Sequence, residues 1–106
     1  MTKYLIQANY VGDGVKGLLK EGGTSRRAVV EKAVNSLGGT VEAFYYAFGE
    51  TDVYAVIEFP DNASAAAFAL TVSASGAVTV NTTVLMTPEE VDEAAKKTPS
   101  YRSPGQ

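Results

Sequence analysis

The sequence predicts an α+β domain in which two β-α-β halves share one four-stranded antiparallel sheet, with two helices on one face. Each half runs from strand-like to helix-like to strand-like sequence, and Gly49-Glu50-Thr51-Asp52 joins the halves as a tight turn. The order β-α-β-β-α-β is that of the ferredoxin-like split sandwich. A chain of 106 residues has the length of one domain with a single core, so we expect residues 1–106 to form one unit.

In the first half, Lys3 to Tyr10 alternate with the period of two that is typical of a strand. The glycine-rich segment Val11 to Gly23 is predicted to be a loop. A helix then begins at the capping residue Thr24 or Ser25 and ends at Gly38-Gly39. Its apolar positions have helical spacing: Val30, Ala33, Val34 and Leu37.

The second half begins with a predicted hairpin, formed by the aromatic-rich strand Thr40 to Phe48 and the strand Asp52 to Phe59. The second of these strands alternates between two sets of residues. We expect the apolar set under the helices (Val53, Ala55, Ile57, Phe59) and the mixed set on the opposite face (Asp52, Tyr54, Val56, Glu58). Pro60-Asp61 stops the second of these strands. Asp61 is a good N-cap for the alanine-rich helix predicted over Asn62 to Ala74, which Gly76 closes.

Beyond this helix, the valine- and threonine-rich segment Ala77 to Met86 is predicted to be the last strand. Thr87-Pro88-Glu89-Glu90 has the form of a capping box with proline at the first helical position, which predicts a short helix to Lys97. We expect the tail, Thr98 to Gln106, to run extended over the surface.

Composition excludes several classes of function. Histidine, cysteine and tryptophan are absent, so the chain has no disulfide, no thiolate chemistry, no His-ligated metal and no Ser-His or Cys-His pair. We therefore expect no haem, flavin or tightly held metal, and no other cofactor. A net charge of −3 without a basic cluster argues against nucleic-acid binding.

The chain also carries no sign of membrane targeting. Its longest apolar run, Ala65 to Val72, is too short to span a bilayer, and Met1-Thr2-Lys3 leads straight into strand-like sequence without a signal-peptide core. A cytoplasmic location and no membrane partner are the resulting expectations.

The face of the sheet that the helices leave uncovered, here called the open face, indicates self-association. We expect this face to carry an unusually large apolar patch for a monomer. The expected apolar members are Phe44, Tyr46, Phe48, Tyr54 and Leu85. A second copy packed sheet to sheet would cover them in a closed dimer. The polar residues expected beside them, among them Gln7, Asn9 and Glu58, would be costly to bury without partners and so favour an internal cavity.

The sequence resembles the GYD-domain family through a series of short motifs that cover nearly the whole chain in order. They are Asn9-Tyr10, Ser25-Arg26, Gly38-Gly39, Gly49-x-x-Asp52, Glu58-Phe59-Pro60-Asp61 and Tyr101-Arg102-x-Pro104-Gly105. The resemblance implies a dimeric α/β barrel. One departure is Thr51, which stands where the tyrosine of the family's Gly-Tyr-Asp would be, so the chain lacks that hydroxyl.

The resemblance implies no defined biochemical function. Wider relatives in the dimeric α/β-barrel class include cofactor-free monooxygenases, haem-degrading enzymes, isomerases and stress-response proteins, and a shared fold does not transfer function. Our first hypothesis is a homodimeric or higher oligomeric protein that binds a small organic molecule. The alternatives are a cofactor-free enzyme of the monooxygenase or isomerase type, whose catalytic residues the sequence does not identify, and an assembly protein without a ligand.

Seven residues are candidates for ligand binding, each with a structural alternative: Asn9, Tyr10, Arg26, Tyr46, Asp52, Tyr54 and Glu58. Arg26 could hold an anionic ligand or cover the core edge while pairing with a carboxylate. Asp52 could equally serve as a turn former. Glu58 could be a carboxylate in a cavity or the partner of a lysine or arginine.

The tyrosines among these candidates could pack a ligand or belong to the core or an interface. The pocket is expected between the open face and the segment Val11 to Gly23, with Arg26 near its mouth.

Overall fold

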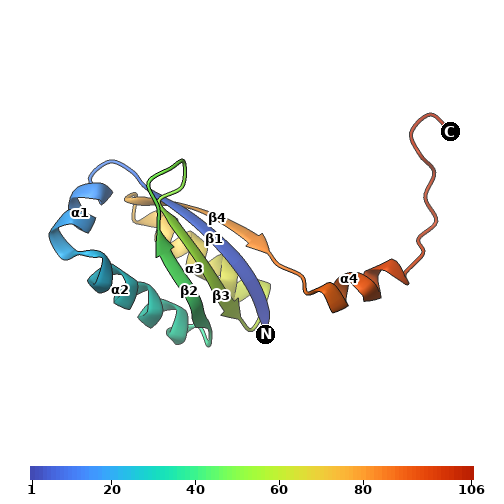
Figure 1. Cartoon of the computed structure of the whole chain (residues 1–106), viewed down its shortest axis with the longest axis horizontal. Helices are drawn as coiled ribbons and strands as arrows, with labels where there is room; N and C mark the ends of the chain where they lie inside the picture. Colours follow the sequence, from blue (N-terminus) through green and yellow to red (C-terminus); the bar gives the residue numbers. More distant parts are fainter.

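The computed structural model describes residues 1–106 and has an α+β fold with one four-stranded antiparallel sheet. The strands are β1 (Thr2–Tyr10), β2 (Thr40–Tyr46), β3 (Val53–Phe59) and β4 (Val78–Val84), arranged in the order β2-β3-β1-β4. The helices are α1 (Gly14–Glu21), α2 (Gly23–Ser36), α3 (Asn62–Ala74) and α4 (Pro88–Ala95). Element order and sheet order are compatible with the predicted ferredoxin-like fold (Figure 1).

The core lies between the sheet and the helices α2 and α3. Alternation along β1 and β3 sends one residue in two to this side, as predicted for β3. The fully buried side chains Tyr4, Phe59, Ile57 and Val34 form the centre of the core. Phe59 makes edge contact with Tyr4, with ring centroids 5.7 Å apart, and tilted contact with Phe68 at 5.8 Å.

The predicted N-caps of the two later helices are confirmed, whereas the predicted cap at Thr24 or Ser25 was wrong, because α2 begins at Gly23 with Gly22 as its N-cap and without a side-chain cap. Asp61 accepts a hydrogen bond of 2.8 Å from the backbone N–H of Ser64 at the start of α3. Thr87 and Glu90 form the reciprocal capping box at the start of α4. Gly38 and Gly76, which follow α2 and α3, have φ angles of 78° and 76°.

The prediction of a loop over Val11 to Gly23 was wrong, because most of this segment is the helix α1. Glycine has low helix propensity, but the apolar residues Val15, Leu18 and Leu19 have the spacing of an amphipathic helix. Gly22, with φ of 86°, separates α1 from α2. The glycine-rich segment is therefore a short helix with a sharp turn at its end.

The predicted faces of β2 were also wrong. A β-bulge between Val41 and Ala43 shifts the register, so Phe44 and Tyr46 pair with the inward-facing Ala55 and Val53. These two aromatic residues consequently lie on the helix side of the sheet. Tyr45 pairs with Tyr54 and takes a place on the open face instead.

The open face has no helix over it. Leu5, Gln7 and Asn9 of β1 lie there beside Tyr54, Val56 and Glu58 of β3, in agreement with the prediction for these strands. Thr79, Asn81 and Thr83 of β4 extend the same face. Tyr45 is 70% exposed and Tyr54 is 41% exposed, which leaves a mixed aromatic and polar surface in the middle of the sheet.

The C-terminal part of the chain projects away from the sheet (Figure 1). Every residue from Met86 to Gln106 is exposed. The radius of gyration is 17.0 Å, against about 13 Å for a compact domain of about 100 residues. No helix is long and apolar enough to cross a membrane.

Candidate functional site

Three hollows meet at Tyr10, where β1 ends beneath α1. The first, the core cavity, has a volume of about 100 Å³ and lies between the sheet and the helices α2 and α3. The second, the α1–α3 hollow, measures about 320 Å³. The third, the hairpin hollow between α1 and the β2–β3 turn, measures about 530 Å³. Tyr10 lines all three, and Arg26 lines the first two.

The walls of the core cavity are almost entirely apolar. Of the 15 residues that line it, 14 are hydrophobic, and Arg26 is the exception. α2 packs on β2, whereas α3 packs on β4 and β3, so the two helices leave a strip over the centre of the sheet between them. Val29, Val30 and Ala33 of α2 face Phe68 and Val72 of α3 across this strip.

The position of Arg26 follows from the helical period of α2. The stripe of α2 through residues 26, 30, 33 and 37 faces the core, while Arg27 lies on the solvent side. The side chain of Arg26 is 29% exposed, and its Nη1 lies 3.3 Å from Oε2 of Glu21. Arg27 pairs with Glu31 at 3.7 Å on the outer surface.

Tyr46 connects β2 to the junction of the two N-terminal helices. Its hydroxyl donates a hydrogen bond of 2.9 Å to the carbonyl oxygen of Gly23. Partial burial, followed by the neighbouring phenol of Tyr10, raises the pKa of Tyr46 from 10.0 to about 12. The charges of Arg26 and Arg27 oppose this rise. Tyr46 is thus a neutral hydrogen-bonding group at physiological pH.

The raised pKa of Tyr46 gives a testable prediction. Since the folded protein favours the protonated phenol, this contribution to stability is complete below pH 10 and is lost as the pH rises from about 10 to about 12. An ultraviolet titration should resolve a late ionisation that belongs to Tyr46. Tyr46→Phe should remove that late step, and a wild-type titration without it would contradict the structure.

Asn9 and Asp52 have a structural role that explains their positions. The backbone N–H of Tyr10 donates to Oδ2 of Asp52 at 3.0 Å, and the backbone N–H of Asp52 donates to Oδ1 of Asn9 at 3.0 Å. These reciprocal bonds attach the β2–β3 turn to the end of β1. The turn-forming alternative for Asp52 therefore describes its contacts, although the residue also lines the hairpin hollow.

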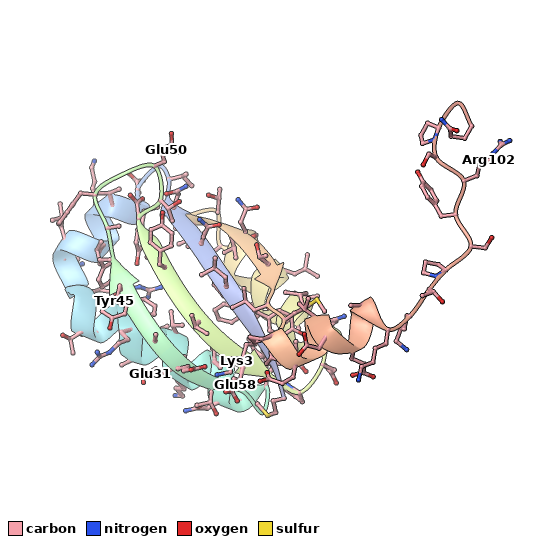
Figure 2. All side chains as sticks on the ribbon, turned by 45° about the vertical axis from the view of Figure 1, so that its right-hand side comes forward. Lys3, Glu31, Tyr45, Glu50, Glu58 and Arg102 are labelled. Atoms are coloured by element: carbon pink, nitrogen blue, oxygen red, sulfur yellow. The ribbon has the colours of Figure 1, made fainter.

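Tyr54 and Glu58 lie on the opposite side of the sheet from Tyr10, Arg26 and Tyr46. Glu58 Oε1 lies 3.6 Å from Nζ of Lys3, which also contacts Glu42 at 2.7 Å. Figure 2 shows Lys3 and Glu58 together at one end of the sheet, with Tyr45 farther along β2. The salt-bridge alternative for Glu58 matches this arrangement.

The candidate residues are therefore divided between two faces. Tyr10, Arg26 and Tyr46 come together on the helix side, whereas Asn9, Tyr54 and Glu58 lie on the open face. The residues predicted to line one pocket between the open face and the segment Val11 to Gly23 do not share a face, because consecutive residues of a strand point to opposite faces. Tyr10 cannot share a face with Asn9.

The comparison with protein families agrees with the motifs along the chain. The model of the GYD domain matches residues 4–95 of the 106 residues. The chain belongs to the GYD-domain family. No curated protein and no solved structure matches it.

Within this GYD-family protein, sequence reasoning missed the lining of the core cavity. Val29, Phe68 and Val72 were not among the candidate residues, although the apolar stripe of α2 indicated that its inner face meets the sheet.

No group of three or more acidic residues is placed to hold a metal ion.

Proposed function

We propose that this GYD-family protein is a homodimer that packs sheet against sheet in an α/β barrel and binds a small organic molecule. The uncovered sheet is the observation that carries the proposal. It exposes the aromatic rings of Tyr45 and Tyr54 next to Leu5 and Val56, without any element of its own chain above them. Large exposed apolar patches mark interaction sites.

The polar residues of the open face support a twofold contact with specific pairing. Lys3, Glu42 and Glu58 form an ion group at one end of the sheet. The hydrogen bond from Lys3 to Glu42, followed by the charges of Glu42 and Glu58, raises the pKa of Lys3 above its ordinary value. Polar groups at the rim of an apolar patch fix the orientation of partners more than they add affinity.

The small-molecule half of the proposal is supported by the hollows around Tyr10. Ligand sites are concave and mostly apolar, with a few polar groups that orient the ligand. The core cavity and its two neighbours combine apolar walls with the hydroxyls of Tyr10 and Tyr46 and the guanidinium of Arg26. The phenol of Tyr46 is neutral at physiological pH and donates to the carbonyl oxygen of Gly23, so this residue is not a base, which favours binding over proton abstraction by Tyr46.

A pair of charge substitutions tests the dimer. Val56 lies in the middle of the open face, and Val56→Glu would place two like charges near each other across a twofold interface. We expect this variant to sediment as a monomer at concentrations where the wild type is a dimer. Leu70→Glu is the matched control, because Leu70 is 71% exposed on α3, on the other side of the molecule.

The proposed interface would be contradicted if the Val56→Glu variant remained a dimer and the Leu70→Glu variant became a monomer. The ligand half has a separate test: mass spectrometry of small molecules released from protein purified without an affinity tag should detect a compound in stoichiometric amount. Small-molecule binding would be contradicted if no such compound were released and no member of a broad metabolite set raised the melting temperature. That result would not contradict the proposed dimer.

A further inference from the structure

We propose that the site on the helix side takes a compact apolar carboxylate, whose hydrocarbon body fills the core cavity and whose carboxylate lies against Arg26. This inference rests on the small-molecule half of the proposed function and not on the dimer. The proposed site lies between the sheet and the helices and not on the open face.

The cavity defines the apolar half of the ligand. Protein interiors are close-packed, and voids larger than a water molecule are few. A cavity of about 100 Å³ with one polar lining residue is therefore a distinctive feature of this core. An apolar cavity of about 150 Å³ in another protein stays dry and binds benzene, so a cavity of this order can take one small ring or a branched alkyl group.

The way into the cavity defines where the polar group of the ligand would lie. The core cavity and the α1–α3 hollow share Tyr10, Arg26, Val72 and Val78, so the two spaces adjoin at these residues. Val29, on the rim of the cavity, is 50% exposed. A ligand that entered from the hollow would place its body among the valines and leave its head group beside Arg26.

The charge of the head group follows from the side chains at this junction. Arg26 is the one charged residue that lines the cavity, and a guanidinium has five N–H donors in a fork that matches a carboxylate. Its partner Glu21 contacts one nitrogen, Nη1, at 3.3 Å, and the Glu21 side chain is 48% exposed. Such an exposed ion pair is weak, so a ligand carboxylate can share the guanidinium or displace Glu21.

Three related probes separate the parts of this proposal: benzoate, its uncharged isostere benzamide, and acetate, which lacks the ring. In calorimetric titrations of the full-length protein, we expect benzoate to bind and the other two to bind at least about tenfold more weakly. Nuclear magnetic resonance should show benzoate-dependent shifts at Val30, Ala33 and Val72, and none at Leu5 or Val56 of the open face.

Adjacent arginines provide the matched variants. Arg26→Ala should weaken benzoate binding by about tenfold to hundredfold, whereas Arg27→Ala, on the solvent side of the same helix turn, should leave it nearly unchanged. Glu21→Gln should strengthen binding, because it removes the competing carboxylate. Melting temperatures of the unliganded variants control for changes in the fold.

Several results would overturn the proposal. Equal binding of benzamide and benzoate would reject the carboxylate while retaining a small-molecule site. Equal losses of benzoate affinity in Arg26→Ala and Arg27→Ala would show that benzoate responds to the overall surface charge and not to a contact with Arg26. Shifts confined to the open face, or no binding of benzoate at millimolar concentration, would reject the site itself, whereas a released ligand of another class would preserve the proposed function.

Discussion

Replacing Phe59 by alanine should lower the free energy of unfolding by about 3–5 kcal/mol, the cost of removing a buried aromatic side chain from a packed core. Phe59 has no exposed surface and contacts Tyr4 and Phe68 through their rings. It also lies next to Gly39, where an added Cβ would come within 3.0 Å of its ring, so this part of the core has no free space.

Chemical denaturation at one protein concentration measures the effect of Phe59→Ala. Phe48→Ala is the control, because it deletes the same side chain at a fully exposed position of the hairpin. We expect the control to change stability by less than about 0.5 kcal/mol. Similar losses in the two variants would contradict the placement of the core between the sheet and the helices.

The second large effect is expected at Gly14, the first residue of α1. A Cβ added there would lie 2.2 Å from the carbonyl oxygen of Ala77. That oxygen also accepts a 2.9 Å hydrogen bond from the backbone N–H of Val11, so it is held in place. Gly14→Ala must push α1 away from the start of β4, at a cost of about 1–3 kcal/mol or more.

Gly17→Ala is the matched control within the same helix. An added Cβ at Gly17 meets nothing within 4 Å, and alanine is the better helix former by about 1 kcal/mol, so this variant should be as stable as the wild type or more stable. Thermal unfolding distinguishes the two. A Gly14→Ala protein as stable as the wild type would show that α1 does not pack against Ala77. The α1–α3 hollow, which both Gly14 and Ala77 line, would then not have the described shape.

The sequence predicted most of the architecture because its signals are local. Alternation along β3, the cap at Asp61 and the capping box at Thr87 each depend on neighbouring residues, and the structure confirms all three. The helix α1 was missed for a related reason. Its glycines have low helix propensity, and α1 packs on α2 and against Ala77 at the start of β4, which the local pattern does not reveal.

The site was harder to predict because it depends on register. A bulge of one residue in β2 moved Phe44 and Tyr46 from one face of the sheet to the other, and neither composition nor period marks where such a bulge occurs. The structure brings together Tyr10, Arg26 and Tyr46, but on the helix side, where the stripe of α2 already placed Arg26.

The exposed C-terminal segment bears on how these variants are compared. Met86 to Gln106 adds no buried residue to the core, so the stability effects described above belong to residues 1–85. Figure 2 shows Arg102 far from the sheet on this segment. The proposed dimer contact lies on the open face of the sheet, within residues 1–85.

Sedimentation equilibrium of the untagged wild-type protein tests the proposed sheet-to-sheet assembly most directly. Over micromolar concentrations, we expect a molar mass of twice the 11.1 kDa of the chain, or an even multiple of it. A mass of 11.1 kDa throughout this range would contradict the account, because the open face would then be stable in water without a partner.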